Sequence, residues 1–184
     1  MRLADSLRNG LSATRARLRR DAKKGSAAIE FAIVAPVFFL FLMGIIEVGT
    51  MYVANSILQK ATDDAARYIR TGQAQAVNMT QSQFRTYLCS RITTLLACDS
   101  NLQIDVRDYS TSYNSASYTS AIGSDGNLDA TFNQYNIGTA GDVILVRVFY
   151  QWAPMTPLIS PLLKNETNGK HMLTATAAFT NEPF

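Results

Sequence analysis

Histidine, cysteine and tryptophan are scarce in this chain of 184 residues, which contains one His, two Cys and one Trp. Structural zinc sites draw on clusters of cysteine and histidine, and so few residues in no recognised spacing do not form one. The sequence also has no glycine-rich phosphate-binding loop, and no Ser, Cys or carboxylate lies in a recognisable catalytic motif. We therefore expect no metal site, no cofactor and no enzymatic activity.

Charged residues are few, at 17% of the chain, and they are unevenly distributed. Residues 1–24 hold eight of the 17 Lys and Arg residues and only two acids, whereas the rest of the chain is net negative. A basic arm that binds nucleic acid is one interpretation, but an apolar segment follows directly, so we expect no nucleic-acid partner. Lys and Arg beside a first hydrophobic helix keep that end in the cytoplasm, which places the region after Gly49 across the membrane.

An apolar run starts a few residues after this basic region. The sixteen residues from Phe31 to Ile46 carry no charge, and the segment 26–49 is about long enough to cross a bilayer. No convincing A-x-A-like pair of small residues follows, which argues against a removable secretory signal. We predict a transmembrane helix that stays in the mature protein, with a kink or local unwinding at Pro36.

Glu30 is the exception within this segment. An unpaired carboxylate just inside the end of an apolar helix is costly in lipid and marks a functional site by default. The alternative is a plain signal anchor whose interfacial glutamate reaches toward water. If Glu30 is functional, a positively charged group must meet it.

Beyond Gly49 the helix is predicted to continue as an amphipathic helix over residues 50–72 and to end at Gly72. Apolar side chains recur there at helical spacing, with charged and amide side chains on the opposite face. The apolar positions are Ala54, Ile57, Leu58, Ala61, Ala65, Tyr68 and Ile69.

A short helix over 81–92, with Ser82 as a plausible cap, and three strands are predicted to follow. The strands are LQIDVR, VILVRVFYQW and HMLTATAAF, and each has one apolar face at alternate positions. A sheet with one apolar face needs a cover, and the amphipathic helix is the natural one. The predicted fold is α+β: a long N-terminal helix packed on a small antiparallel sheet.

The two cysteines, Cys89 and Cys98, lie on the side assigned across the membrane, in the periplasm or exterior, where a disulfide is permitted. In one unbroken helix their Cα atoms would be roughly 13 Å apart, which is too far for a bridge. A disulfide therefore requires the chain to reverse between them. Two unrelated buried thiols are the alternative.

Two further segments have unusual compositions. Residues 109–141 are rich in Ser, Thr, Asn, Gly and Tyr, which predicts an exposed loop, either simply solvated or used for recognition through Tyr113, Tyr118 and Tyr135. Residues 153–163 contain three prolines among apolar residues. We expect this segment to cap the core; the alternative is an apolar patch for a partner subunit.

The sequence KKG at 23–25, followed by a glutamate at the fifth position after the glycine, resembles the processing site of type IV prepilins. More of the chain resembles the TadE-like proteins, which are minor pilins or pseudopilins of the tight-adherence pilus. The similar stretches are SAAIEF after Gly25, Pro36, GIIEVG, ATDDAARYIRTG, and the closing VFYQWAPMTPLISPLL and LTATAAFTNEP.

This resemblance implies a pilin-like fold and a division into a leader over 1–25, a membrane helix over 26–49 and a periplasmic or extracellular domain over 50–184. It implies cleavage between Gly25 and Ser26 by a prepilin peptidase, and pairing of Glu30 with the new α-amino group of a neighbouring subunit. The implied partners are that peptidase, the major and other minor pilins, the inner-membrane assembly platform and the bilayer. The implied location is the bacterial inner membrane, with an assembling or capping role in the pilus. The competing hypothesis is an uncleaved, membrane-anchored scaffold or adhesin.

Overall fold

The structure is a computed structural model that describes residues 2–92, 95–110, 112 and 119–184, with side chains from residue 26 onward. The chain divides into two compact units, Met1–Ile45 and Ile46–Phe184. Helix α1 (Arg2–Arg70) contributes to both units. The second unit adds the short helices and a three-stranded sheet, so the predicted α+β class is confirmed.

The first unit consists of helix. The sequence predicted a membrane helix over 26–49, but α1 begins at Arg2 and passes through Gly10. Leu, Ala and Arg dominate this stretch and have high helix propensity, while one glycine costs only about 1 kcal/mol. The helix also continues through Pro36, so the local unwinding expected there does not occur.

The second part of α1 ends as predicted. Its last residue is Arg70, and Gly72 follows with a φ of 77°, in the left-handed region that favours glycine. Phe184, the last residue of the chain, packs so closely here that a Cβ on Gly72 would lie 2.5 Å from the Phe184 ring. Glycine is therefore required at this helix end by both conformation and space.

Two short helices follow, α2 (Gln73–Ala76) and α3 (Gln81–Cys89). The α3 helix was expected to reach Ile92 and to be capped by Ser82, and both details were wrong. Thr80 is the cap: its hydroxyl accepts from the Gln83 N–H, and the Gln83 side chain accepts from the Thr80 N–H. This reciprocal capping box satisfies two backbone donors at once, which a cap at Ser82 would not achieve.

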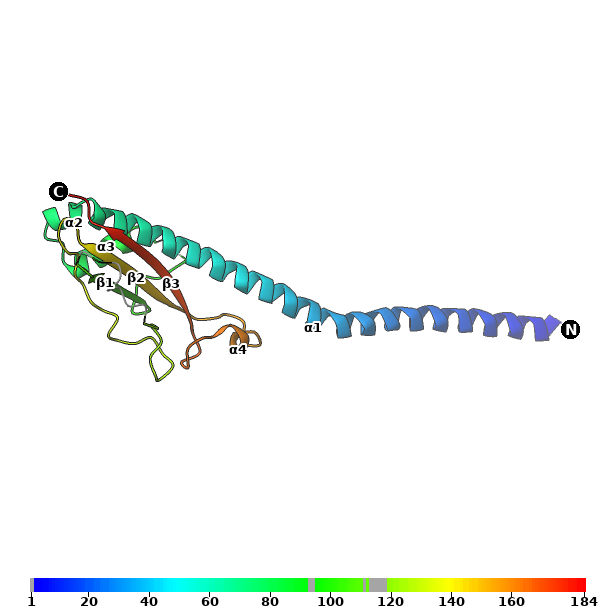
Figure 1. Cartoon of the computed structure of the whole chain (residues 1–184). Coiled ribbons are helices and arrows are strands. Elements are labelled where there is room, and N and C mark those ends of the chain that lie inside the picture. The colour runs from blue at the N-terminus through cyan, green and yellow to red at the C-terminus, as the bar shows by residue number, and fades with distance from the viewer. Residues whose placement is uncertain (1, 93–94, 111, 113–118) are drawn as a thin grey trace. The chain divides into compact units, whose positions relative to one another are not determined.

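The sheet is antiparallel, in the order β1 (Leu102–Asp108), β2 (Val143–Trp152) and β3 (His171–Thr180). These bounds agree with the strands predicted from alternation. Figure 1 shows β3 lying beside the second part of α1, with β1 on the far side of the sheet.

Helix α1 and strand β3 run in the same direction within the second unit. Gln59 bonds both backbone groups of Thr176: its Nε2 donates to the Thr176 carbonyl and its Oε1 accepts from the Thr176 N–H, each at 3.2 Å. Further along, the N–H of Glu182 donates to the Arg70 carbonyl at 2.9 Å. The start of β3 therefore lies near residues just after 46, and its end lies near the end of the helix.

One face of the sheet packs against the helix, as predicted, and together they form the core. Ala54, Leu58 and Ala65 of α1 are fully buried, and Phe84 and Leu88 of α3 join them. The strand residues in this core are Leu102, Ile104, Val106, Ile144, Val146, Val148, Tyr150, Trp152, Leu173 and Ala175.

The described residues of the loop over 109–141 are mostly exposed or half-buried, as predicted, but part of the loop covers the opposite face of the sheet. Phe132 from that loop is 3% exposed and packs edge-on against Phe149 of β2, with ring centroids 5.7 Å apart. Tyr135 packs on Phe84 across the sheet edge. Tyr113 and Tyr118 lie outside the described residues.

A buried ion pair lies under this loop. Asp105 is fully buried, and Arg147 on the neighbouring strand donates to its Oδ2 from Nη2 at 2.7 Å. The Arg147 guanidinium also lies 4.4 Å from the Phe132 ring centroid. Such a pair is costly to desolvate, and it persists because the remaining carboxylate oxygen accepts from the Gln134 N–H.

Candidate membrane and assembly site

The predicted processing residues lie in the helical first unit. Gly25 and Ser26 are both within α1, and Glu30 follows one turn later. The Ser26 hydroxyl donates to Glu30 Oε1 at 3.0 Å, and both side chains are exposed. Glu30 therefore has a hydroxyl of the same helix as its described partner.

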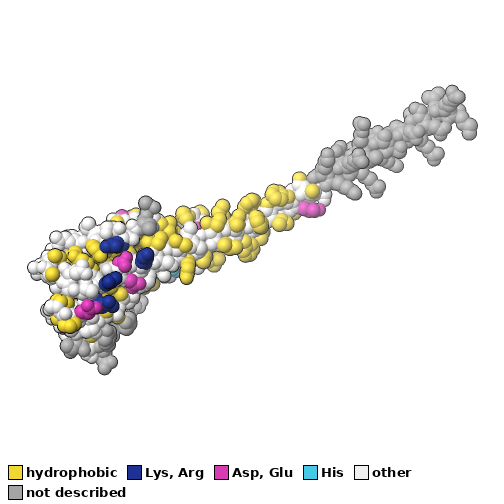
Figure 2. Space-filling view, turned by 90° about the horizontal axis from the view of Figure 1, so that it is seen from above, with side chains coloured by type: hydrophobic (Ala, Val, Ile, Leu, Met, Phe, Trp, Pro, Cys, Tyr) yellow, Lys and Arg dark blue, Asp and Glu magenta, His cyan; other side chains and the backbone are white. Residues whose placement is uncertain are grey.

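The surface that follows Glu30 is apolar. The helix Ser26–Arg70 is long and apolar enough to cross a membrane, judged by length and composition. Phe31, Ile33, Phe41 and Ile45 are each more than 60% exposed. Figure 2 shows yellow side chains over the visible face of this stretch. Such a continuous apolar surface is suited to lipid and is unusual in a soluble monomer.

Glu47 ends the apolar run and is only 1% exposed, in contrast to Glu30. Its carboxylate accepts three hydrogen bonds from the segment after β2: Met155 N–H at 2.8 Å, Thr156 N–H at 3.0 Å and the Thr156 hydroxyl at 2.8 Å. We call this arrangement the Glu47 clamp. Hydrogen bonds from backbone N–H groups favour the ionised carboxylate and offset its burial.

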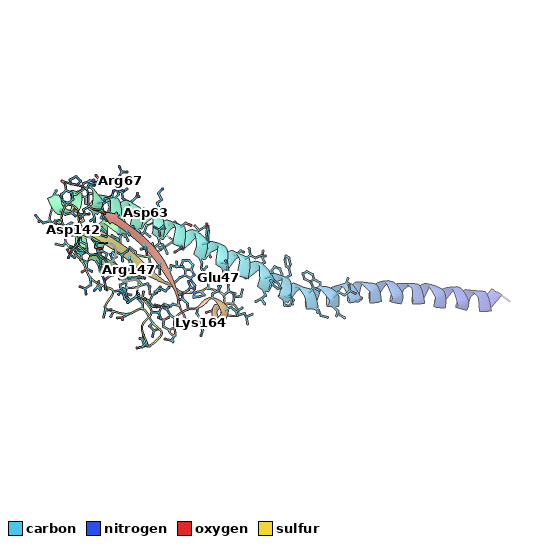
Figure 3. The ribbon with its side chains drawn as sticks, in the orientation of Figure 1. Glu47, Asp63, Arg67, Asp142, Arg147 and Lys164 are labelled. Atoms are coloured by element: carbon cyan, nitrogen blue, oxygen red, sulfur yellow. A yellow bond between two sulfur atoms is a disulfide. The ribbon has the colours of Figure 1, made fainter. Side chains whose placement is uncertain are left out.

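The clamp holds residues 153–163 at the end of the sheet where β2 ends and β3 begins (Figure 3). This segment contains one helical turn, α4 (Ser160–Leu163), with a proline in its first turn. We expected it to cap the core, but Met155, Leu158 and Leu162 are 64%, 78% and 84% exposed. The cap prediction was wrong because Glu47 holds the backbone while these side chains point into solvent; Leu163 alone of the apolar residues in α4 packs on the core.

Cys89 and Cys98 are brought together and joined as a disulfide, with Cα atoms 5.8 Å apart. The helix α3 ends at Cys89, which gives the chain room to reverse before β1. The bridge therefore connects the end of α3 to the segment that leads into the sheet. Both cysteines belong to the second unit, so the contribution of the bridge is to the stability of that unit.

Sequence reasoning missed Glu47 as a site residue. It appeared only as part of the stretch GIIEVG. The available signal was the second carboxylate beside an apolar run, which demands a partner by the same argument that singled out Glu30. Its partners lie 108 and 109 residues further along, and nothing in the local pattern names them.

Residues 25–67 match the family model described as TadE-like protein. Over this segment, the chain is similar to the TadE-like family. The match confirms the family resemblance and is consistent with a TadE-like protein of the Tad pilus system. A comparison with curated proteins and with solved structures finds no match.

The TadE-like segment contains Gly25, Ser26 and Glu30, the apolar run, Glu47 and most of the amphipathic part of α1. The sheet, the disulfide and residues 153–163 lie outside it. The family match therefore includes Glu47 but not Met155 and Thr156, whose groups donate to its carboxylate. It also suggests a protein associated with the Tad pilus and anchored by its apolar helix.

Proposed function

We propose that this protein is a minor pilin or pseudopilin of the tight-adherence pilus. It inserts into the bacterial inner membrane through residues 26–49, with its N-terminus in the cytoplasm and residues 50–184 in the periplasm. A prepilin peptidase cleaves it after Gly25, and the mature chain helps to assemble or cap the pilus. The protein itself carries out no catalytic step, and its partners are other pilins and the assembly platform.

One observation carries this proposal. Glu30 is exposed at the start of the apolar run, inside the TadE-like segment, and its described partner is the hydroxyl of Ser26. In lipid, a lone hydroxyl does not neutralise a carboxylate, so a cation is needed. Cleavage after Gly25 would create an α-amino group at Ser26, and a neighbouring subunit's group of this kind supplies the charge.

The test compares two glycine variants by intact mass of the protein recovered from membranes. Gly25→Leu should remain full length, because a bulky residue blocks the peptidase site without reducing hydropathy. Gly49→Leu is the matched control: it lies in the same helix, and a Cβ there would meet no atom within 4 Å. It should be cleaved like the wild type.

Recovery of a chain beginning at Ser26 from Gly25→Leu would contradict the processing proposal. A wild-type protein that retains Met1 in a strain with an active prepilin peptidase would favour the uncleaved scaffold or adhesin instead.

A further inference from the structure

We propose that residues 153–163 form an apolar foot that inserts into the surface of the same bilayer that the N-terminal helix crosses, on the periplasmic side. The foot would anchor the domain at a second point, by lying in the interface and not by spanning it. The inference rests on the membrane crossing in the proposed function and goes beyond the family match, which ends at residue 67.

The position of the foot relative to the apolar run follows from its contact with Glu47, the residue directly after that run. Ile46 is the last residue of the uncharged run, and Glu47 is the next one. The Glu47 carboxylate lies 2.8 Å from the Met155 nitrogen, so the foot is held where the helix leaves the apolar region. Both residues belong to the second unit, so this contact is made within one unit.

The side chains of the foot suit the boundary between acyl chains and headgroups. Met155, Leu158 and Leu162 are the most exposed large apolar residues described after residue 80. No acidic residue occurs from 153 to 163, and the exposed Lys164 follows directly, where its ammonium group can reach lipid phosphates. On α1, Tyr52 is 74% exposed five residues after Glu47, as expected for an aromatic side chain at a membrane interface.

The foot also has few backbone N–H groups that need water as a hydrogen-bond acceptor. Unsatisfied N–H groups are costly in lipid, and Pro154, Pro157 and Pro161 have none. The Glu47 clamp takes the N–H groups of residues 155 and 156, and those of 159, 160, 162 and 164 donate to carbonyls within the segment. Most of the backbone N–H groups of the foot are therefore paired, as insertion into the membrane interface requires.

Site-directed nitroxide labelling in vesicles tests the foot. Single cysteines would replace Leu158 or Leu162 in the full chain, with Ala140→Cys as the matched control at the opposite end of β2. The native cysteines are bridged and do not react with the label. Vesicles of phosphatidylethanolamine and phosphatidylglycerol are isolated by flotation, and collisions of the label are measured with oxygen, which concentrates in lipid, and with a water-soluble nickel complex.

Labels at 158 and 162 should collide more with oxygen and less with nickel than the label at 140. Nickel accessibility equal to the control in chains that float would overturn the foot. Exclusion of both reagents at 158 and 162 would also overturn it, because another copy of the chain would then cover the segment. A chain that does not float with the vesicles would contradict the membrane helix itself, and so the failure of the proposed function is distinguishable from failure of the foot alone.

Discussion

Glu30 and Glu47 are the two carboxylates that border one apolar run, and their surroundings are opposite. Glu30 is exposed and accepts one hydrogen bond from a hydroxyl four residues away. Glu47 is buried and accepts three from a segment more than a hundred residues away. The hydrogen bonds of Glu47 are made within its own chain, whereas Glu30 retains capacity to bind another molecule. The same residue type thus serves folding at one end of the run and, in our proposal, assembly at the other.

Removing the charge of Glu30 should have the largest effect on assembly. Glu30→Gln should still insert and be cleaved, but breaking a pair in a low-dielectric setting costs about 3 kcal/mol or more, which is a loss of association of over a hundredfold. Crosslinking to the major pilin and counts of pili per cell measure this. Glu182→Gln removes an exposed glutamate at the far end of the second unit and should assemble normally. Normal crosslinking of Glu30→Gln would reject the assembly role.

Truncating Glu47 should lower the stability of the fold, whereas the change at Glu30 affects assembly. Glu47→Ala leaves the Met155 and Thr156 N–H groups without their acceptor, which should lower the free energy of unfolding by about 3 kcal/mol. Urea unfolding in detergent, followed by the fluorescence of Trp152 next to the clamp, measures this loss. Glu182→Gln should change the free energy by no more than about 1 kcal/mol, because its ion pair with Arg70 is exposed on both sides. Equal stabilities for the two variants would show that the clamp contributes little.

The disulfide provides a stability contribution that should be independent of both glutamates. Replacing Cys89 and Cys98 together by alanine should cost about 2 to 3 kcal/mol, from the loop-entropy relation for a closed loop of this size. Reductant should destabilise the wild type by a similar amount and leave the double variant unchanged. The cost should add to that of Glu47→Ala, since the two sites share no partner. If reductant also destabilises the double variant, its effect on the wild type does not come from the disulfide.

Tyr135 should give the smallest effect and a distinct pH signature. Burial raises the pKa of Tyr135 to about 12, and its hydroxyl has no hydrogen-bond partner among the described residues. In the unfolded chain this group ionises near pH 10, so its presence lowers stability as the pH rises from about 10 to 12. Tyr135→Phe should be neutral or slightly stabilising at pH 7, and it should lose less stability above pH 10. Parallel pH profiles for the two proteins would contradict this assignment.

The strands and the amphipathic half of α1 were predictable because each buries one face. Apolar residues therefore recur along the sequence at the spacing of a strand or of a helix. The Asp105–Arg147 pair illustrates the limit. Alternation alone placed both residues on the outer face of the sheet, but it did not show that Phe132 and its loop would cover that face. The Glu47 clamp was missed for the same reason: its two halves are adjacent only after the sheet has formed.

Local competition explains the smaller errors. Thr80 and Ser82 are both residue types that cap helices well. Thr80 is the cap because Gln83 lies three positions after it and can complete the capping box. The start of α1 was placed too late because the prediction followed the apolar segment over 26–49, although strong helix formers also precede it. The processing role of Gly25 and Ser26 stays a prediction, because cleavage depends on an enzyme that acts on the chain.

The hydrogen bonds that Gln59 makes to Thr176 have a consequence for how copies of this protein can associate. They occupy backbone groups on the outer edge of β3, and residues 134 and 136 do the same for β1 at Val106. An edge whose donors and acceptors are already used offers a poor template for another strand. Extending the sheet from chain to chain would therefore first require these bonds to break. Any fibre that contains this subunit is expected to be held by contacts between helices, and detergents that disrupt such contacts should disperse it into folded protein.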